Sequence, residues 1–178
     1  KRTLTKIMKI TSGSTPEISK KIDNLYKTII KAGTYNVDNI KIAESAKIIE
    51  NCQRDINIAL VNDLSMILPK LGVDIEEVLD AAATKWNFHR YSPGIGVGGH
   101  CIPVDPYFLI DQANEANSPV NLVSSAREIN NAMPSYVANE ISRFLDIENI
   151  PKNNRKALLL GWSYKPGIGD ARGSPSEF

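Results

Sequence analysis

A glycine-rich segment that ends in a cysteine is the part of this sequence best suited to chemistry. Four of the six residues in 94–99 are glycines, and His100 and Cys101 follow directly. Glycines let a backbone approach a ligand closely or present N–H groups to a phosphate. His100, and a helix expected to begin near Asp105, would both favour the reactive thiolate form of Cys101. A simpler interpretation also fits, in which Cys101 is a buried, inert thiol and Asp105 caps a helix.

Lys47 and Asn51 form a second candidate pair. They lie four residues apart in a segment with helical periodicity, so they share one helix face. That face differs from the apolar stripe through Ile49, Ile56 and Leu60. An ammonium group beside a carboxamide is able to stabilise an oxyanion as it develops. The alternative is a solvated Lys–Asn pair on an exposed helix, and the spacing alone favours that alternative.

A loop with two cations, residues 164–172, follows the apolar run 156–162. A continuous apolar run is typical of a buried parallel strand. Open α/β sheets bind ligands at loops that leave the carboxyl ends of such strands. Lys165 and Arg172 therefore suit this loop to phosphate groups, although surface loops also carry cations for solubility alone.

The two cysteines and two histidines do not indicate a metal site. Cys52, His89, His100 and Cys101 lack the paired spacing of zinc ligands, and an adjacent His-Cys pair fits one tetrahedral ion poorly. Two cysteines are also too few for a disulfide framework, which is typical of a protein in the reducing cytoplasm.

The composition excludes several classes of protein. The chain has 178 residues with 21 basic and 20 acidic side chains, so its net charge of +1 gives no field that would gather nucleic acid or anionic membrane. A hydrophobic fraction of 42% with 23% charged residues is typical of a folded soluble protein. No stretch approaches the roughly 18 apolar residues of a membrane span. The composition therefore predicts a soluble cytoplasmic protein with no nucleic-acid or membrane partner.

The elements that would position these residues are mainly helices. Apolar residues recur at helical spacing through residues 39–71, and beyond Ile56 further faces also turn apolar. A helix that is apolar nearly all round is buried on more than one side, which predicts a second subunit. Shorter helices are expected at 16–33, 74–84, 105–117, 120–132 and 134–146, with strands at 7–11 and 156–162. Thr15 is the expected N-cap of the first of these helices.

Taken in this order, the segments resemble the UDP-glucose/GDP-mannose dehydrogenase family of nucleotide-sugar 6-dehydrogenases. Three blocks carry the resemblance: residues 43–51 with 54–60, the loop 94–105, and the loop 164–172. The run Gly-Gly-His-Cys-Ile-Pro-Val-Asp-Pro is similar to the branch that acts on UDP-N-acetylhexosamines. The similarity extends through nearly all 178 residues.

The resemblance implies a mainly α fold, with a long-helix central dimerisation domain between partial α/β (Rossmann-like) pieces. Residues 1–36 would end an N-terminal NAD-binding Rossmann domain, 37–150 would form the central helical dimerisation domain, and 151–178 would begin a C-terminal UDP-binding domain. The family's Gly-x-Gly-x-x-Gly fingerprint, ribose-binding acid and catalytic Glu belong to an earlier part of the family plan. The chain is therefore expected to be a fragment that is inactive alone.

The implied reaction oxidises the sugar C6 alcohol to a carboxylate in two steps with two NAD. Cys101 falls on the family's nucleophile, which forms a thiohemiacetal and then a thioester. Lys47 and Asn51 fall on the residues that steady the oxygen gaining negative charge. Asp105 falls on the residue that assists proton transfer or positions the water.

The resemblance also assigns binding roles. Arg90, Tyr91, Gly98 and Lys165 fall on positions at the UDP-sugar, and Arg172 falls on a position that reaches NAD. The uronic acid product would supply polysaccharide biosynthesis. A different class of function stays open, in which the chain is a catalytically silent helical module for dimerisation or binding. The intact set of Cys101, Lys47, Asn51 and Asp105 favours the enzyme.

Overall fold

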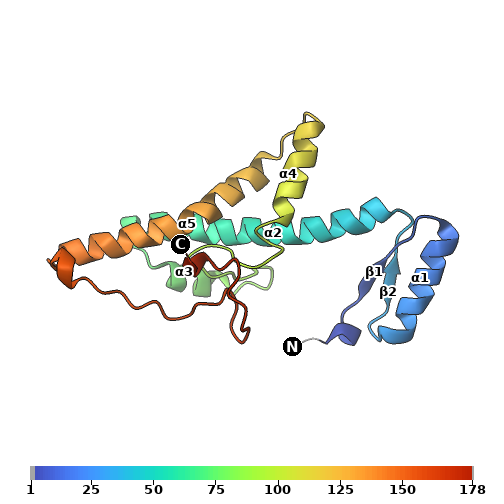
Figure 1. The fold of residues 1–178 in the computed structure, drawn as a ribbon, viewed down its shortest axis with the longest axis horizontal. Helices are drawn as coiled ribbons and strands as arrows, with labels where there is room; N and C mark the ends of the chain where they lie inside the picture. Colours follow the sequence, from blue (N-terminus) through green and yellow to red (C-terminus); the bar gives the residue numbers. More distant parts are fainter. Residues whose placement is uncertain (1–2, 178) are drawn as a thin grey trace. The chain divides into compact units, whose positions relative to one another are not determined.

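A computed structural model, which describes residues 3–177, shows a mainly helical chain, as predicted (Figure 1). The longest helix is α2 (Ile40–Ile67). Packing divides the chain into an N-terminal unit, Lys1–Glu50, and a C-terminal unit, Asn51–Phe178. The family-based division into 1–36, 37–150 and 151–178 stays a prediction, and its residues 1, 2 and 178 lie outside the described part.

The N-terminal unit contains a parallel strand–helix–strand motif. After a 3-10 turn, η1 (Leu4–Lys6), strand β1 (Lys9–Thr11) leads into α1 (Pro16–Ile29), and β2 (Thr34–Asn36) returns beside β1. Thr15 caps α1, as predicted, because its hydroxyl accepts the N–H of Ile18 at 3.3 Å. The sequence does not predict β2, since three residues are too few to show a strand period.

Asp23 ties α1 to β1 in this unit. The Thr11 hydroxyl donates to one Asp23 oxygen at 2.8 Å, and the Lys27 ammonium lies 2.5 Å from the other. Lys27 above all, with the hydroxyl bonds, lowers the pKa of the Asp23 carboxyl from 3.8 to about 2. The folded unit therefore favours the carboxylate form of a side chain that is itself buried.

In the C-terminal unit, α2 is followed by α3, α4 and α5. The bounds are η2 (Leu68–Leu71), α3 (Ile75–Ala82), α4 (Asp105–Glu115), α5 (Asn121–Ile147), η3 (Lys152–Asn154) and η4 (Pro175–Glu177), where η denotes a 3-10 turn. Helix α4 packs against α5, and residues 83–104 form an irregular segment between α3 and α4. Within this segment, residues 94–103 are called the glycine-rich loop.

Helix α5 contradicts the prediction of two helices that meet at Pro134. It runs through this proline without ending. A proline inside a helix has no N–H for the carbonyl four residues earlier, which here belongs to Asn130. That carbonyl faces the glycine-rich loop, since a Cβ built on Gly96 would lie 3.1 Å from the Asn130 oxygen. The loop therefore packs near the carbonyl that Pro134 leaves without its helical hydrogen bond.

The predicted strand at 156–162 is also not formed. The only sheet in the described residues is β1–β2, and a strand requires a neighbour for its backbone hydrogen bonds. Leu158 and Leu160 are 83% and 84% exposed in this irregular stretch. The chain after it turns back instead to the glycine-rich loop, where the Gly99 N–H donates to the Gly173 carbonyl at 3.2 Å.

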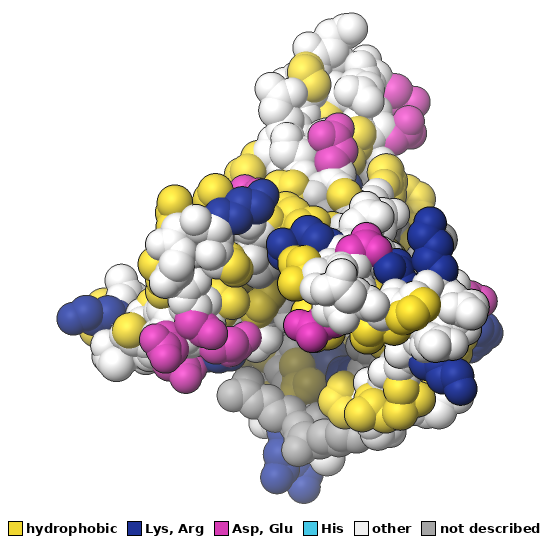
Figure 2. All heavy atoms as spheres, turned by 90° about the vertical axis from the view of Figure 1, so that its left-hand side faces the viewer, with side chains coloured by type: hydrophobic (Ala, Val, Ile, Leu, Met, Phe, Trp, Pro, Cys, Tyr) yellow, Lys and Arg dark blue, Asp and Glu magenta, His cyan; other side chains and the backbone are white. Residues whose placement is uncertain are grey.

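Half of the buried residues of α2 are polar. Its buried residues are Asn51, Cys52, Asp55, Ala59, Val61 and Asn62. Ile49 and Leu60 of the apolar stripe are 60% and 55% exposed within this single chain. Figure 2 shows many other hydrophobic side chains on one face of the molecule.

No helix within residues 3–177 has both the length and the apolar character to cross a membrane.

We expect Asp23→Asn to reduce stability at neutral pH but not near pH 2. A carboxyl whose folded pKa is lowered from 3.8 to about 2 stabilises the fold above pH 4, and this contribution is lost as the pH falls through 2. Urea unfolding followed by circular dichroism from pH 2 to 7 measures the difference between wild type and variant. Glu17→Gln, at an exposed ion pair on the same helix, is the control and should show little change. An Asp23→Asn effect of equal size at pH 2 and pH 7 would contradict the assignment.

Candidate active site

Cys101 is exposed at the end of the glycine-rich loop, directly before α4. Its carbonyl accepts the N–H groups of Val104 at 3.0 Å and Asp105 at 2.8 Å, which fixes the turn into the helix. The interpretation of Cys101 as a buried thiol is therefore wrong. Cys52 is the buried cysteine, and burial raises the pKa of its thiol, with the Asp55 carboxylate acting in the same direction. Of the two cysteines, Cys101 is the one accessible to a substrate.

Asn51 and Asp105 form a hydrogen bond beside this turn. The Asn51 amide of α2 donates to a carboxylate oxygen of Asp105, and Asn51 is only 1% exposed. The solvated alternative is therefore wrong for Asn51. The capping alternative is wrong for Asp105, because Asp105 is the first residue of α4 and Val104 occupies the N-cap position. The structure thus brings Asn51, Asp105 and Cys101 together in one unit.

Lys47 lies one turn before Asn51 on α2 and belongs to the N-terminal unit. Its ammonium is 3.5 Å from a carboxylate oxygen of Glu50, and more than half of its side chain is exposed. The predicted action of Lys47 at the reacting oxygen stays a prediction.

The glycine-rich loop packs closely against the segment 161–175. A Cβ on Gly98 would lie 2.5 Å from the Tyr164 Cβ, 2.7 Å from the Pro175 Cδ and 2.9 Å from the Gly173 oxygen. Only a residue without a side chain fits there. The contact of Gly98 with the sugar nucleotide, which the family resemblance implies, stays a prediction, and the structure shows that this glycine packs against the segment 161–175.

His100, Asp170 and Arg172 link the same two segments. Arg172 donates through two nitrogens to the two carboxylate oxygens of Asp170, both at 2.9 Å, and a ring nitrogen of His100 lies 3.2 Å from Asp170. Arg172, with a smaller effect of His100, lowers the pKa of the Asp170 carboxyl. The ring of Tyr164 meets that of His100 edge-on at 6.2 Å between centroids. Sequence reasoning missed Asp170, which lies between two residues that it did select.

Arg90, Tyr91 and Lys165 are the remaining predicted binding residues. Arg90 donates to Asp80 at 3.0 Å, to Ser92 at 2.8 Å and to Glu76, so two carboxylates of α3 hold its guanidinium. Tyr91 is half-buried and Lys165 is exposed. Their contacts with a sugar nucleotide stay predictions.

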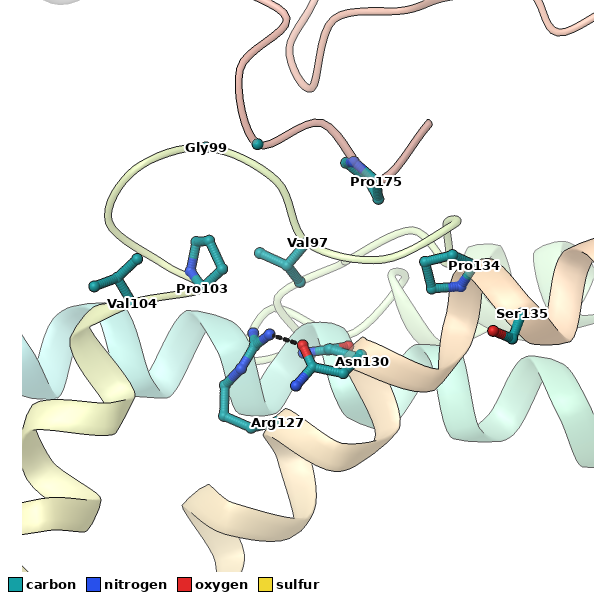
Figure 3. Close-up of a pocket in the computed structure, with 11 residues that line it drawn as sticks. Val97, Gly99, Pro103, Val104, Arg127, Asn130, Pro134, Ser135 and Pro175 are labelled. Atoms are coloured by element: carbon teal, nitrogen blue, oxygen red, sulfur yellow. Dashed lines mark hydrogen bonds between the residues drawn. The ribbon is translucent and has the colours of Figure 1, made fainter. Parts of the chain in front are cut away.

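A buried polar network that the sequence analysis missed lies behind the loop. It consists of Asp55 and Asn62 on α2 with Arg127 and Asn130 on α5, and none of these residues is more than 3% exposed. Figure 3 shows Arg127 and Asn130 on one side of a pocket of about 480 Å³, which the glycine-rich loop lines from the other side. Burial raises the pKa of Asp55, while Arg127 and Asn130 act in the opposite direction. The sequence signal that could have indicated this network is the recurrence of Asn51, Asp55 and Asn62 on one face of a helix.

The glycines of the loop do not lie in a dinucleotide-binding context. Gly94, Gly96 and Gly99 have the Gly-x-Gly-x-x-Gly spacing, but an irregular segment after α3 precedes them in place of a strand. Across residues 3–177 the structure gathers no set of three or more His, Cys, Asp or Glu side chains that could hold a metal ion.

The family model for the central domain of UDP-glucose/GDP-mannose dehydrogenases matches residues 41–132, just over half of the chain. The chain belongs to this dehydrogenase family. A UDP-N-acetyl-D-glucosamine 6-dehydrogenase from Pseudomonas aeruginosa is 45% identical over 93% of this chain and 39% of the relative. One of the same name from Salmonella typhi is 45% identical over 97% of the chain and 40% of the relative.

A solved structure supports the same family relationship. The UDP-D-ManNAc dehydrogenase from Pyrococcus horikoshii matches with a TM-score of 0.86 at 34% identity, over 94% of this chain and 39% of that protein. This dehydrogenase-family chain thus spans about 40% of the length of the curated relatives it matches. The helical fold around α2 is therefore the family's central domain.

We expect Gly98→Ala to separate the glycine-rich loop from the segment 161–175. The added methyl group would overlap backbone and ring atoms, and overpacking of this kind costs about 1–3 kcal/mol. Amide hydrogen exchange should show lost protection at Gly99, whose N–H bonds to Gly173. Gly94→Ala is the matched control, because nothing lies within 4 Å of its built Cβ. Equal exchange in the two variants would show that the two segments are not in contact in solution.

Proposed function

We propose that this chain is the central part of an NAD-dependent UDP-N-acetylhexosamine 6-dehydrogenase, an enzyme that oxidises the sugar C6 alcohol to a carboxylate. The observation that carries the proposal is the exposed Cys101 beside the buried Asn51–Asp105 pair. The names of the relatives, which refer to UDP-N-acetyl-D-glucosamine and UDP-N-acetyl-D-mannosamine, support the substrate class. Two free cysteines fit a reducing cytoplasm, where this thiol stays available.

Cys101 acts as the nucleophile on the intermediate aldehyde. Its sulfur bonds to the carbonyl carbon and gives a thiohemiacetal, which holds the substrate between the two oxidations. The second oxidation leaves a thioester, and water hydrolyses it to the uronic acid and the free thiol. A covalent adduct is needed because it carries the aldehyde to the acid without release.

Asn51, Asp105 and Lys47 act around the reacting oxygen. The Lys47 ammonium and the Asn51 amide stabilise the negative charge that develops on it. Asp105 accepts a hydrogen bond from Asn51 and is held at the start of α4, where a carboxylate interacts favourably with the helix dipole. Asp105 therefore orients Asn51 and assists proton transfer or positions the hydrolytic water.

The binding residues lie in the loops. Lys165, Gly98, Arg90 and Tyr91 contact the UDP-sugar. NAD, when bound, accepts a hydride in each of the two oxidations. Arg172 contributes one contact to NAD. Its side chain is 81% exposed, so it is accessible to an anionic group of the cofactor although it is paired with Asp170.

The active protein is a homodimer that forms around α2. Ile49, Leu60 and Ile67 are between 46% and 60% exposed within the single chain, and burial of such side chains contributes about 25 cal/mol per Å². A second copy is the natural cover for one long helix that exposes its apolar stripe, because a two-fold axis pairs the stripe with itself.

Replacement of the nucleophile is the direct test of the reaction. In full-length enzyme, Cys101→Ser should abolish acid formation and leave UDP-sugar binding nearly unchanged, because a serine hydroxyl is a poor nucleophile without its own base. NADH formation and calorimetric binding, with a panel of UDP-N-acetylhexosamines, measure the two effects. Cys52→Ser is the control thiol replacement and should retain turnover. Wild-type turnover by Cys101→Ser would return the chain to the alternative of a silent binding module.

The 178-residue chain should be a dimer of about 39 kDa in solution, twice its mass of 19.6 kDa. Leu60→Arg should give a monomer at micromolar concentration, because it places a charge in the apolar stripe. Sedimentation equilibrium measures the mass. Leu158→Arg, at an exposed leucine outside α2, is the control and should stay dimeric. A monomeric wild-type chain would contradict the proposed interface.

A further inference from the structure

A chain of hydrogen bonds runs from a buried charge to the start of the glycine-rich loop. Asp55 accepts from Arg127 Nη1 at 2.6 Å and from the amide of Asn130 at 2.8 Å. Asn130 Oδ1 accepts from the amide nitrogen of Asn62 at 2.9 Å. Asn62 Oδ1 then accepts the backbone N–H of Gly94 at 2.9 Å. The hydrogen bonds of four buried side chains therefore lead to the backbone N–H of Gly94, an exposed residue.

The direction of this chain is set at its charged end. A carboxylate only accepts hydrogen bonds, so Asn130 must turn its nitrogen toward Asp55 and its oxygen toward Asn62. Asn62 must then donate to Asn130, which leaves its own oxygen for Gly94. Neither amide is able to rotate without setting two like groups against each other. The ion pair between Asp55 and Arg127 thus fixes which atom meets the loop.

The same two helices hold the loop at further points. Asn51 binds Asp105 just after the loop, and Asn62 binds Gly94 at its start. Asn51 and Asn62 are three turns apart on one face of α2, roughly 16 Å at 1.5 Å per residue. The backbone of Asn130 also contacts Gly96. Cys101 therefore lies on a chain segment that buried amides of α2 hold on both sides.

We propose that Asn62 and Asn130 are positioning residues for the Cys101 nucleophile, which they place through the hydrogen bond to Gly94. The inference rests on the proposed function, since Cys101 must be the reacting group. Both amides are buried and are proposed to act through the loop. A displacement of about 1 Å in a reacting group lowers a rate by about 10²-fold, so loss of the relay should reduce kcat rather than substrate binding.

Asn62→Asp in full-length enzyme tests the relay. The introduced carboxylate accepts from Gly94 but has no proton for Asn130, so the relay is broken above its pKa. When protonated, the carboxyl donates like the original amide. We expect kcat about 10–100-fold below wild type at pH 8, with KM within about three-fold, and recovery as the pH falls toward 6. The charged groups of the relay, Asp55 and Arg127, are present in both proteins, so the ratio of variant to wild type isolates the new carboxyl.

Asn139→Asp, at an exposed position of α5, is the matched control, and its ratio to wild type should not change with pH. A kcat ratio for Asn62→Asp that is near one, or that is low but independent of pH, would overturn the proposal. Hydrogen exchange of the amides of residues 94–101 is measured in the same proteins. If wild type oxidises no UDP-sugar, the proposed function fails. Unaltered loop exchange in Asn62→Asp overturns the relay independently of activity.

Replacement on the loop side tests the same bond without a change in the buried network. Gly94→Pro removes the N–H donor, whereas Gly94→Ala keeps it and meets open space. We expect kcat to fall about ten-fold or more in Gly94→Pro, and to change less than about two-fold in Gly94→Ala. Equal kcat in these two folded variants would also overturn the proposal.

Discussion

Asp55 and Arg127 carry opposite charges in the interior of the C-terminal unit, where neither side chain is more than 4% exposed. Desolvation of two charges is costly, and removal of one partner from such a pair typically destabilises a protein by about 3–5 kcal/mol. Directed contacts on both sides offset part of this cost, while Asp55 Oδ2 and Arg127 Nε are buried without a hydrogen-bond partner in the described part of the chain. Asn130 donates to Asp55, and Arg127 donates to Asn131 and lies 5.8 Å from the ring centroid of Tyr107. The pair thereby joins α2, α4 and α5.

The polar residues of this interior also explain why Ile49 and Leu60 of α2 lie outward. Asp55 and Asn62 occupy the face that meets α5, so Ile49 and Leu60 are left on other faces. A hydrogen-bonded polar core specifies side-chain orientation more strictly than an apolar core does, because each amide and carboxylate requires a particular partner in a particular orientation. One helix therefore bonds to the glycine-rich loop through its polar face, while Ile49 and Leu60 stay exposed within the single chain.

Most of the helices and the accessible position of Cys101 could be predicted from the sequence, because periodicity and the glycine-rich run are local signals. Residues 39–71 predict α2 closely, and Cys101 is exposed at the end of the loop. The buried network could not be predicted in the same way. Asp55 and Arg127 are 72 residues apart, and a charged residue in a helix is normally solvent-exposed. Pro134 misled the prediction, because α5 continues through it and Gly96, distant in the sequence, packs near the carbonyl of Asn130.

The close approach of Gly98 to the Tyr164 Cβ has a consequence for chimaeras made between relatives. A side chain at position 98 fits only if the residues at 164, 173 and 175 change shape with it. These three positions lie after α5, the last α-helix of the described residues. A chimaera joined after residue 176 would take the glycine-rich loop and the segment 161–175 from the same parent. A junction near residue 151 would instead take the loop from one parent and the segment packed against it from the other.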